Sequence, residues 1–261
     1  MTVVVLDLDG VLWRGDEPIP GSADAVAALR AGGARIAFLT NNSSTRIGDY
    51  LEKFARFGID ATAEEVLTSA QAAAELLTAT MAPGASVLAC AGPGVVEALE
   101  LAGFEVKREW PVDAVVVGWH RDFDFDGLDR AAHAVREGAR FVATNADPTY
   151  PGAAHVLPGA GSIVAAIATA SGRVPEVAGK PEPPAVAMVR RRLGDRGVMV
   201  GDRPSTDGAM ATALGWPFAL VLSGIGGHDP DEPVPTPAPE YVAEDLAALV
   251  PRLLAEHVDG S

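Results

Sequence analysis

Short runs of β-branched and aliphatic residues alternate along the chain with longer amphipathic segments, a pattern typical of parallel α/β proteins. The first run, Val3-Val4-Val5-Leu6, has no polar residue in alternation, so it predicts a strand buried on both faces. Comparable patterns predict strands at 3–9, 35–40, 65–68, 197–201 and 218–222, and helices at 22–32, 44–57, 184–193 and 244–256.

A second α/β pattern occupies the middle of the chain. Strands are expected near 86–91, 104–108, 114–119, 140–144 and 155–157, with helices between them. The polar stretches described below that suit catalysis all lie outside this span. We therefore predict a Rossmann-like parallel-sheet core from residues 1–70 and 178–261, with a second α/β domain inserted at 71–177.

Polar residues follow the predicted core strands. Asp7 and Asp9 come at the end of the first strand, where two like charges repel each other and contribute little to a fold. In open α/β sheets this edge is where ligands bind, so we infer a bound cation and chemistry on an anionic group. Three further stretches suit the same crevice: Thr40-Asn41-Asn42-Ser43-Ser44, Gly179-Lys180-Pro181 and residues 198–207.

In this order, the four stretches resemble the motifs of the haloacid dehalogenase superfamily of aspartate-nucleophile phosphatases. Those at 40–44, 179–181 and 201–203 are most similar to the subfamily of 4-nitrophenylphosphatases, phosphoglycolate phosphatases and sugar-phosphate phosphatases, which carries a large α/β cap where this chain has its insertion. The likeness continues through residues 115–118, 143–148 and 158–163. Pro204-Ser205 departs from the family pattern, which more often has a bulkier residue and an acid there.

The resemblance implies a role for each core residue. Asp7 is expected to be the nucleophile that forms an aspartyl-phosphate, and Asp9 the general acid and base. Thr40, Asn41 and Asn42 lie at a strand-to-helix turn and are expected to bind phosphate oxygens. Lys180 is expected to supply positive charge to the substrate and the transition state.

The expected cofactor is Mg²⁺, because the candidate ligands are hard oxygens and no cysteine–histidine cluster is present. The expected ligands are the side chains of Asp7 and Asp202 and the backbone carbonyl of Asp9. Asp207 is expected in a supporting position, binding metal waters or orienting Lys180, with a helix N-cap as the alternative.

Two aromatic residues of the insertion, Trp119 and Tyr150, follow predicted cap strands. We expect both to contact the organic part of the substrate, because the core motifs reach only the phosphoryl group. The alternative, a partly buried tryptophan and a surface tyrosine, stays open at this point.

The formal net charge of −15 argues against a nucleic-acid partner, which requires a basic surface. It also opposes an anionic substrate, since two unit charges 4 Å apart interact by about 4 kcal/mol at a dielectric constant near 20. Mg²⁺ and Lys180 are the expected counter-charges. Cys90, the only cysteine, is expected to be a core thiol. The absence of a long apolar stretch and of a signal-peptide pattern predicts a cytoplasmic protein without a membrane span.

We therefore predict a Mg²⁺-dependent phosphatase of a small phosphorylated metabolite, and consider a homodimer through the cap as the candidate assembly. Glycerol phosphate, phosphoglycolate, a sugar phosphate and pyridoxal phosphate stay open as substrates. A signalling receiver domain would use a similar acidic cluster, but would need about half this length. A non-catalytic binding protein on the same fold is the other alternative, although it would have no need of both Asp7 and Asp9.

Overall fold

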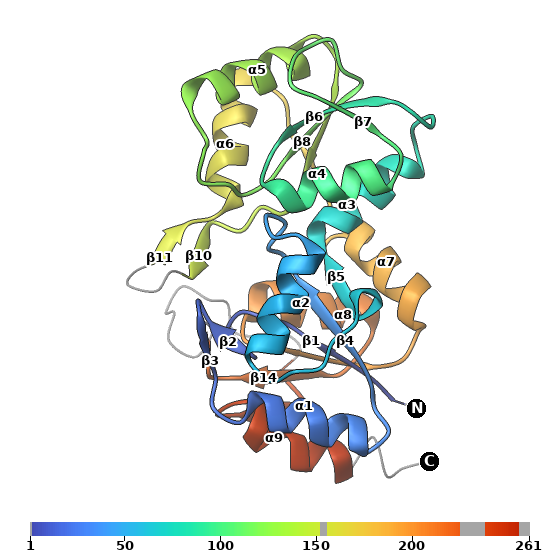
Figure 1. Cartoon of the computed structure of the whole chain (residues 1–261), viewed down its shortest axis with the longest axis vertical. Coiled ribbons are helices and arrows are strands. Elements are labelled where there is room, and N and C mark those ends of the chain that lie inside the picture. Colours follow the sequence, from blue (N-terminus) through green and yellow to red (C-terminus); the bar gives the residue numbers. More distant parts are fainter. Residues whose placement is uncertain (1, 152–155, 225–237, 256–261) are drawn as a thin grey trace.

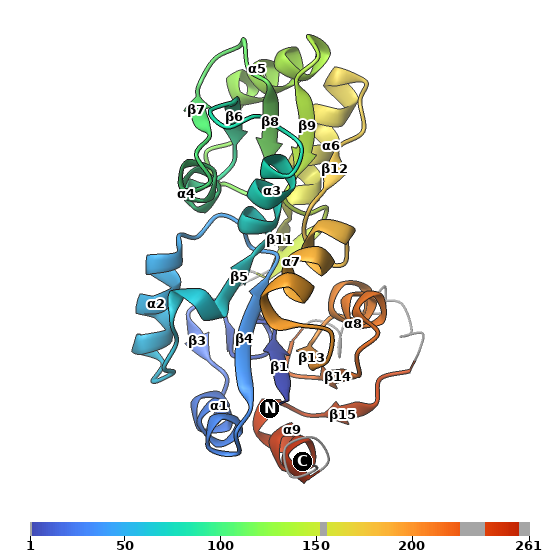
Figure 2. The ribbon, with the colours of Figure 1, turned by 90° about the vertical axis from the view of Figure 1, so that its right-hand side faces the viewer.

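The computed structural model describes residues 2–151, 156–224 and 238–255. Two α/β units lie one above the other, and the upper one contains the elements from β6 (Ser86–Cys90) to β9 (Arg140–Ala143) (Figure 1). The C-terminal ends of β4 (Arg35–Thr40) in the lower unit and of β9 in the upper unit point toward each other (Figure 2). The predicted α/β class with parallel sheets is confirmed.

The lower sheet is parallel throughout, in the order β15-β14-β13-β1-β4-β5. Its strands, besides β4, are β1 (Val3–Leu6), β5 (Val66–Thr68), β13 (Val198–Gly201), β14 (Phe218–Val221) and β15 (Tyr241–Ala243). The helices and helical turns around it are α1 (Ser22–Ala31), α2 (Ile47–Arg56), η1 (Ala63–Glu65), α7 (Pro183–Leu193), η2 (Pro204–Gly208), α8 (Ala209–Leu214) and α9 (Leu246–Leu253).

Helices cover both faces of the lower sheet, which explains why its strands lack polar residues in alternation. Val4 and Leu6 of β1 pack in one cluster with α1, α2 and α9. Val3 and Val5, on the opposite face of β1, pack in another with α7 and α8. The predicted helix 244–256 corresponds to α9, and residue 256 lies outside the described residues.

The upper sheet is also parallel, in the order β12-β9-β8-β6-β7. Its remaining elements are β7 (Glu105–Lys107), β8 (Ala114–Val117), β12 (Glu176–Val177), α3 (Ser69–Thr78), α4 (Pro93–Leu101), α5 (Phe125–Arg136) and α6 (Ala160–Ser171). Side chains of α5 and α6 pack on one face. Those of α3 and α4 pack on the other, in a cluster that also contains β1 and α7, so the two units share one continuous hydrophobic core.

The strand predicted at 155–157 is not part of the upper sheet. Its described residues belong to β11 (Val156–Pro158), which forms an antiparallel hairpin with β10 (Thr149–Pro151), and residue 155 lies outside the described residues. A parallel neighbour is usually reached through a crossover helix, whereas the described residues between β9 and β11 contain β10 and no helix. The fifth strand is instead β12, which follows the crossover helix α6.

A small hairpin that the hydrophobic pattern does not reveal follows Asp9. Its strands are β2 (Trp13–Arg14) and β3 (Glu17–Pro18), paired antiparallel. The Trp13 side chain is fully buried, and its ring centroid lies 5.2 Å from that of Phe54 and 5.8 Å from that of Phe57. This packing on α2 fixes the chain directly after the two N-terminal aspartates.

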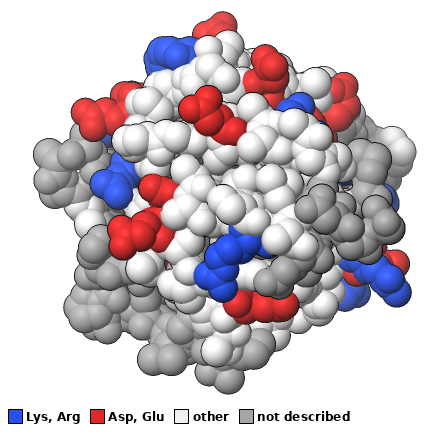
Figure 3. Space-filling view, turned by 90° about the horizontal axis from the view of Figure 1, so that it is seen from below, with Lys and Arg blue, Asp and Glu red and all other residues white. Residues whose placement is uncertain are grey.

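Acidic and basic side chains are interspersed on the face seen from below, and the described residues form no continuous basic patch there (Figure 3). Within the part of the chain that the structure describes, no helix combines the length and the apolar character that crossing a membrane would require.

Cys90 lies at the end of β6 with only 5% of its surface exposed, as expected of a core thiol. Burial raises the pKa of this thiol to about 11. At pH 8 about one thiol in a thousand is then ionised in the folded protein, against roughly a quarter in the unfolded chain.

We therefore expect Ellman's reagent at pH 8 to label Cys90 at least roughly a hundredfold more slowly in native than in urea-unfolded protein. Because the folded thiol has the raised pKa, the native rate should climb as the pH approaches 11. Native labelling at the rate of the unfolded chain would contradict the buried placement.

Candidate active site

Four residues predicted for the site lie at the C-terminal edge of the lower sheet. Asp7 follows β1, Thr40 ends β4, Asp202 follows β13, and Lys180 lies in the turn before α7. All four are buried, although each is polar or charged. Strands that are far apart in the sequence thus bring their polar ends into one crevice, as the parallel order of the sheet requires.

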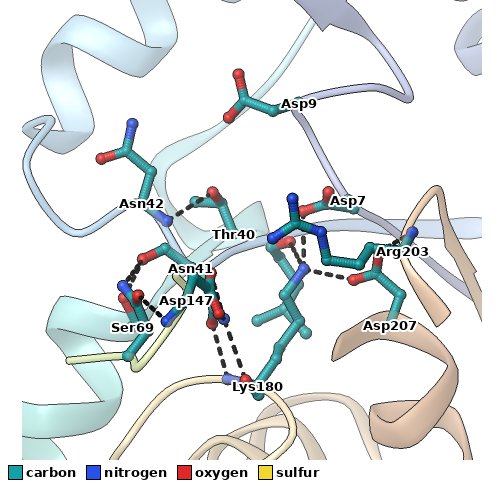
Figure 4. A network of polar contacts seen from close by, with 12 residues as sticks. Asp7, Asp9, Thr40, Asn41, Asn42, Ser69, Asp147, Lys180, Arg203 and Asp207 are labelled. Carbon is teal, nitrogen blue, oxygen red and sulfur yellow. Dashed lines mark hydrogen bonds and ion pairs between the residues drawn. The ribbon is translucent and has the colours of Figure 1, made fainter. Parts of the chain in front are cut away.

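The ammonium of Lys180 joins two of the aspartates (Figure 4). Its Nζ donates to Asp7 Oδ1 at 2.8 Å, to Asp207 Oδ1 at 2.7 Å and to the Leu39 carbonyl at 3.1 Å. Burial by itself lowers the pKa of Lys180, but the carboxylates of Asp207 and Asp7 outweigh it and raise that pKa. Lys180 is therefore a permanent cation with all three hydrogens engaged. Of the two roles predicted for Asp207, orienting Lys180 matches this contact.

Asp7, Asp202 and Asp207 form a cluster in which one carboxylate oxygen from each lies within 4.8 Å of the others. Burial raises the pKa of Asp7 well above its usual value; Lys180 opposes the shift, and the charges of Asp207 and Asp202 add to it. Lys180 forms ion pairs with two of these carboxylates, Asp7 and Asp207. The unusual Pro204-Ser205 pair lies in η2 between Asp202 and Asp207, and both aspartates still reach the cluster.

Glycines make room for the Asp202 carboxylate. A Cβ at Gly10 would lie 2.5 Å from Asp202 Oδ2, and one at Gly224 would overlap the same carboxylate. Gly10 also has a φ of +87°, a conformation that side chains rarely adopt. These two positions explain why the chain turns sharply after Asp9 and how Asp202 comes close to β1.

Asp9 is held apart from the lysine cluster (Figure 4). Its Oδ1 accepts a hydrogen bond from the Trp13 indole Nε1 at 3.1 Å, and the Lys53 ammonium lies 4.3 Å from the Trp13 ring centroid. Burial raises the pKa of Asp9, while Lys53 and the Trp13 hydrogen bond oppose the shift. Trp13 was not among the predicted site residues, although its position four residues after Asp9 on the same turn was the available signal.

The loop after β4 holds the predicted phosphate-binding residues. Thr40 Oγ1 accepts from the Asn42 backbone amide at 3.0 Å, and Asn42 Nδ2 donates to the Tyr150 hydroxyl at 3.2 Å. The Asn41 side chain is instead engaged with the protein: its Oδ1 accepts from the Lys180 amide at 2.8 Å, and its Nδ2 donates to the Lys180 carbonyl and to Asp147. Asn41 and Asn42 both line the groove described below, and the Asn41 side chain also holds the turn that contains Lys180.

The same loop is inserted into the upper unit. Ser43 Oγ and Thr144 Oγ1 are hydrogen-bonded at 2.9 Å, and the Gly94 amide at the start of α4 donates to the Ser44 carbonyl at 2.8 Å. A Cβ at Gly118 would lie 2.8 Å from Ser43 Oγ, so the upper sheet needs glycine there. The loop that contains the predicted phosphate-binding residues is therefore positioned by both units.

The two predicted cap residues meet each other and the core loop. The rings of Trp119 and Tyr150 stack with their centroids 5.0 Å apart, and the Trp119 indole donates to the Pro158 carbonyl at 2.9 Å. Together with Asn42 and Asp147 they line a narrow groove. A larger hollow of about 440 Å³ shares Trp119 and Gly159 with this groove; its other lining residues are His120, Arg121, Phe123, Leu157, Pro158, Ser162 and Ile163.

The chain matches a model of the haloacid dehalogenase-like hydrolases over residues 4–105 and a second, HAD hydrolase-like model over 177–249. The D-glycerol 3-phosphate phosphatase of Mycobacterium tuberculosis is 38% identical over 250 residues, covering 94% of this chain and 70% of the relative. The acid sugar phosphatase of Staphylococcus aureus is 33% identical over 252 residues, covering 95% of this chain and 96% of the relative.

Solved structures agree with these matches. The glycerol phosphate phosphatase of Mycobacterium tuberculosis in complex with magnesium superimposes with a TM-score of 0.85 at 36% identity, covering 95% of this chain and 76% of that one. The p-nitrophenyl phosphatase of Archaeoglobus fulgidus gives a TM-score of 0.85 at 30% identity, covering 97% and 99%. The predicted resemblance is confirmed, and the chain belongs to the haloacid dehalogenase-like hydrolases, in which its similar relatives are phosphatases.

Proposed function

We propose that this protein is a Mg²⁺-dependent phosphomonoester hydrolase in which Asp7 becomes transiently phosphorylated. The observation that carries the proposal is the buried contact between Lys180 Nζ and Asp7 Oδ1, next to Asp202 and Asp207 at the edge of a parallel sheet. A nucleophilic carboxylate, a fixed cation and a set of oxygen ligands are the parts that phosphoryl transfer requires.

The residues present fit a magnesium ion. Their donors are carboxylate oxygens, which Mg²⁺ prefers, and three buried acids offer oxygens that lie within 4.8 Å of one another. The Asp7 and Asp202 side chains and the Asp9 carbonyl would hold the ion, with Asp207 supporting Lys180. Once bound, Mg²⁺ would neutralise negative charge on Asp7 and on the phosphate oxygens.

Asp7 and Asp9 carry out the nucleophilic attack and the proton transfers. Asp7 attacks phosphorus and displaces the oxygen of the substrate's organic group, and the resulting acyl phosphate is then hydrolysed by water, which releases phosphate and restores Asp7. Asp9, oriented by the Trp13 indole, gives a proton to the leaving oxygen and later takes one from that water. The burial that raises the pKa of Asp9 favours the protonated form needed in the first step.

Phosphate binding falls to Thr40, Asn42 and Lys180. The Thr40 hydroxyl and the Asn42 amides lie at the loop between β4 and α2, and Lys180 supplies the positive charge. Asn41 contributes by fixing the Lys180 backbone. This local cation helps to offset the repulsion that a net charge of −15 imposes on an anionic substrate.

For the substrate we propose a small phosphorylated polyol or sugar. Relatives that share about a third of their residues with this chain are named for glycerol 3-phosphate and for acid sugars. The groove beside the site offers amide, carboxyl and phenol groups from Asn42, Asp147 and Tyr150, which suit hydroxyl groups. Trp119 and Tyr150 then contact the organic part of the substrate. A receiver domain is disfavoured, because the similarity to phosphatases extends over 94% of the chain.

The first test separates the two N-terminal aspartates, with 4-nitrophenyl phosphate and a phosphorylated polyol as substrates. Asp7→Asn should reduce turnover by roughly a thousandfold or more on both, and should abolish covalent labelling, because an amide does not attack phosphorus. Asp9→Asn should retain part of its activity on 4-nitrophenyl phosphate, whose leaving group needs no proton, and lose most on the polyol ester. Near-normal turnover in Asp7→Asn would rule out the covalent route.

The second test concerns the metal. Asp202→Ala should raise the Mg²⁺ concentration for half-maximal activity by roughly tenfold or more, because it removes a direct ligand. The matched control is Asp195→Ala, an exposed aspartate, which should leave that concentration unchanged. Mg²⁺ titrations of activity, with isothermal calorimetry as a second readout, measure the effect. An Asp202→Ala protein that binds Mg²⁺ like the wild type would reject the ligand assignment.

The third test addresses specificity. Trp119→Ala and Tyr150→Ala should change relative kcat/KM among glycerol, sugar and aryl phosphates by a few-fold to about a hundredfold, the range that about 1–3 kcal/mol of pocket contacts produces. Acetyl phosphate, with little organic group to contact, should change far less. Trp110→Ala, at a half-exposed tryptophan of the upper unit, is the control. An equal loss on every substrate would show that the aromatic pair only supports the fold.

A further inference from the structure

One side-chain amide links the two units to the turn that carries the catalytic lysine. Asn41 lies after β4 and is only 8% exposed. Its Oδ1 accepts from the Lys180 backbone amide at 2.8 Å, and its Nδ2 donates to the Lys180 carbonyl at 3.1 Å. The same Nδ2 donates to both carboxylate oxygens of Asp147, at 3.2 and 3.1 Å. Every hydrogen and the oxygen of this amide are therefore engaged (Figure 4).

The orientation of the amide decides whether Lys180 is held. In the observed orientation Asn41 pairs with both polar groups of the Lys180 backbone. If the amide were rotated by half a turn, oxygen would face the Lys180 carbonyl and NH₂ would face its amide, so both contacts would become repulsive. A carboxylate only accepts hydrogen bonds, and Asp147 therefore selects the orientation in which NH₂ faces both it and the Lys180 carbonyl.

Asp147 reaches this point from the other unit, on the loop that follows β9. Neighbouring groups fix its approach: the Asp147 amide donates to Asn145 Oδ1 at 3.1 Å, and Asn145 Nδ2 donates to the Asn41 carbonyl at 2.7 Å. A Cβ at Gly159, between β11 and α6, would overlap the Asp147 carbonyl, so this position needs glycine. Burial raises the pKa of Asp147, which means that this carboxylate is unfavourable by itself and is retained through its partners.

We propose that Asp147 is a positioning residue for catalysis: through the Asn41 amide, the cap holds the turn of Lys180 and thereby sets its ammonium between Asp7 and Asp207. The inference rests on the proposed function, because it takes Lys180 as the cation that binds the transferring phosphate. It gives the upper unit a part in the chemical step as well as in substrate selection.

The test compares Asp147→Ala and Asp147→Asn with Asp126→Ala, which changes an exposed aspartate on α5. With 4-nitrophenyl phosphate, Asp147→Ala should lower kcat by roughly tenfold or more, while the Mg²⁺ concentration for half-maximal activity stays within about twofold of wild type. Asp147→Asn keeps one acceptor oxygen and should fall between Asp147→Ala and wild type. Asp126→Ala should match the wild type.

A double-mutant cycle identifies the route of the effect. If Asp147 acts through Asn41, the loss in Asp147→Ala should nearly vanish in an Asn41→Ala background, whereas independent roles would give additive losses. Thermal melting of each variant checks folding, and if Asp147→Ala does not fold, the kcat of Asp147→Asn decides. Wild-type kcat in the folded Asp147 variants, or additive losses in the cycle, would overturn this inference and leave the phosphatase intact. A wild-type protein without phosphatase activity would overturn both.

Discussion

The site depends on one buried ammonium shared between two carboxylates. Lys180 reaches Asp7 and Asp207 with Nζ–O distances of 2.8 and 2.7 Å, and the three side chains are almost entirely inaccessible to water. A buried charge that lost its partners would strongly destabilise the protein, so the fold has to bring Lys180, Asp7 and Asp207 together. The parallel order β13-β1-β4 does this, because it brings the ends of distant segments side by side.

The upper unit contributes hydrogen bonds to the site as well as covering it. The loop after β4 is hydrogen-bonded by Thr144 and Asn145 and by the Gly94 amide of α4, while glycines at 92, 94 and 118 leave room for this loop. Because α3 belongs to a hydrophobic cluster that includes residues of both sheets, the two units share one hydrophobic core. The stacked rings of Trp119 and Tyr150 lie at the same interface, where Tyr150 accepts a hydrogen bond from Asn42 and Asp147 accepts one from Asn41.

The electrostatics also follow from this arrangement. An acidic chain that acts on an anionic ester needs positive charge at the reacting atoms and has no use for a broad basic surface. Lys180 provides one such charge, and the neighbouring cluster of buried carboxylates has the oxygen donors that suit a divalent cation, which would provide another. The indole of Trp13 holds Asp9 away from that cluster, so its carboxyl lies in an environment that raises its pKa and suits proton transfer.

Local patterns determined much of this protein. Runs of apolar residues located the buried strands, and the polar residues after them located Asp7, Thr40, Lys180 and Asp202, because the end of a strand in a parallel sheet is set by sequence neighbours. The same reasoning found a strand near residues 156–158 but not its antiparallel pairing with β10, and it missed β12, since a two- or three-residue strand has no periodicity to recognise. Only the tertiary structure decided that Asn41 would hold Lys180 and Asp147, partners that are 139 and 106 residues away. Those pairings form because the C-terminal ends of the strands in the two sheets face each other, and no short-range sequence pattern carries that information.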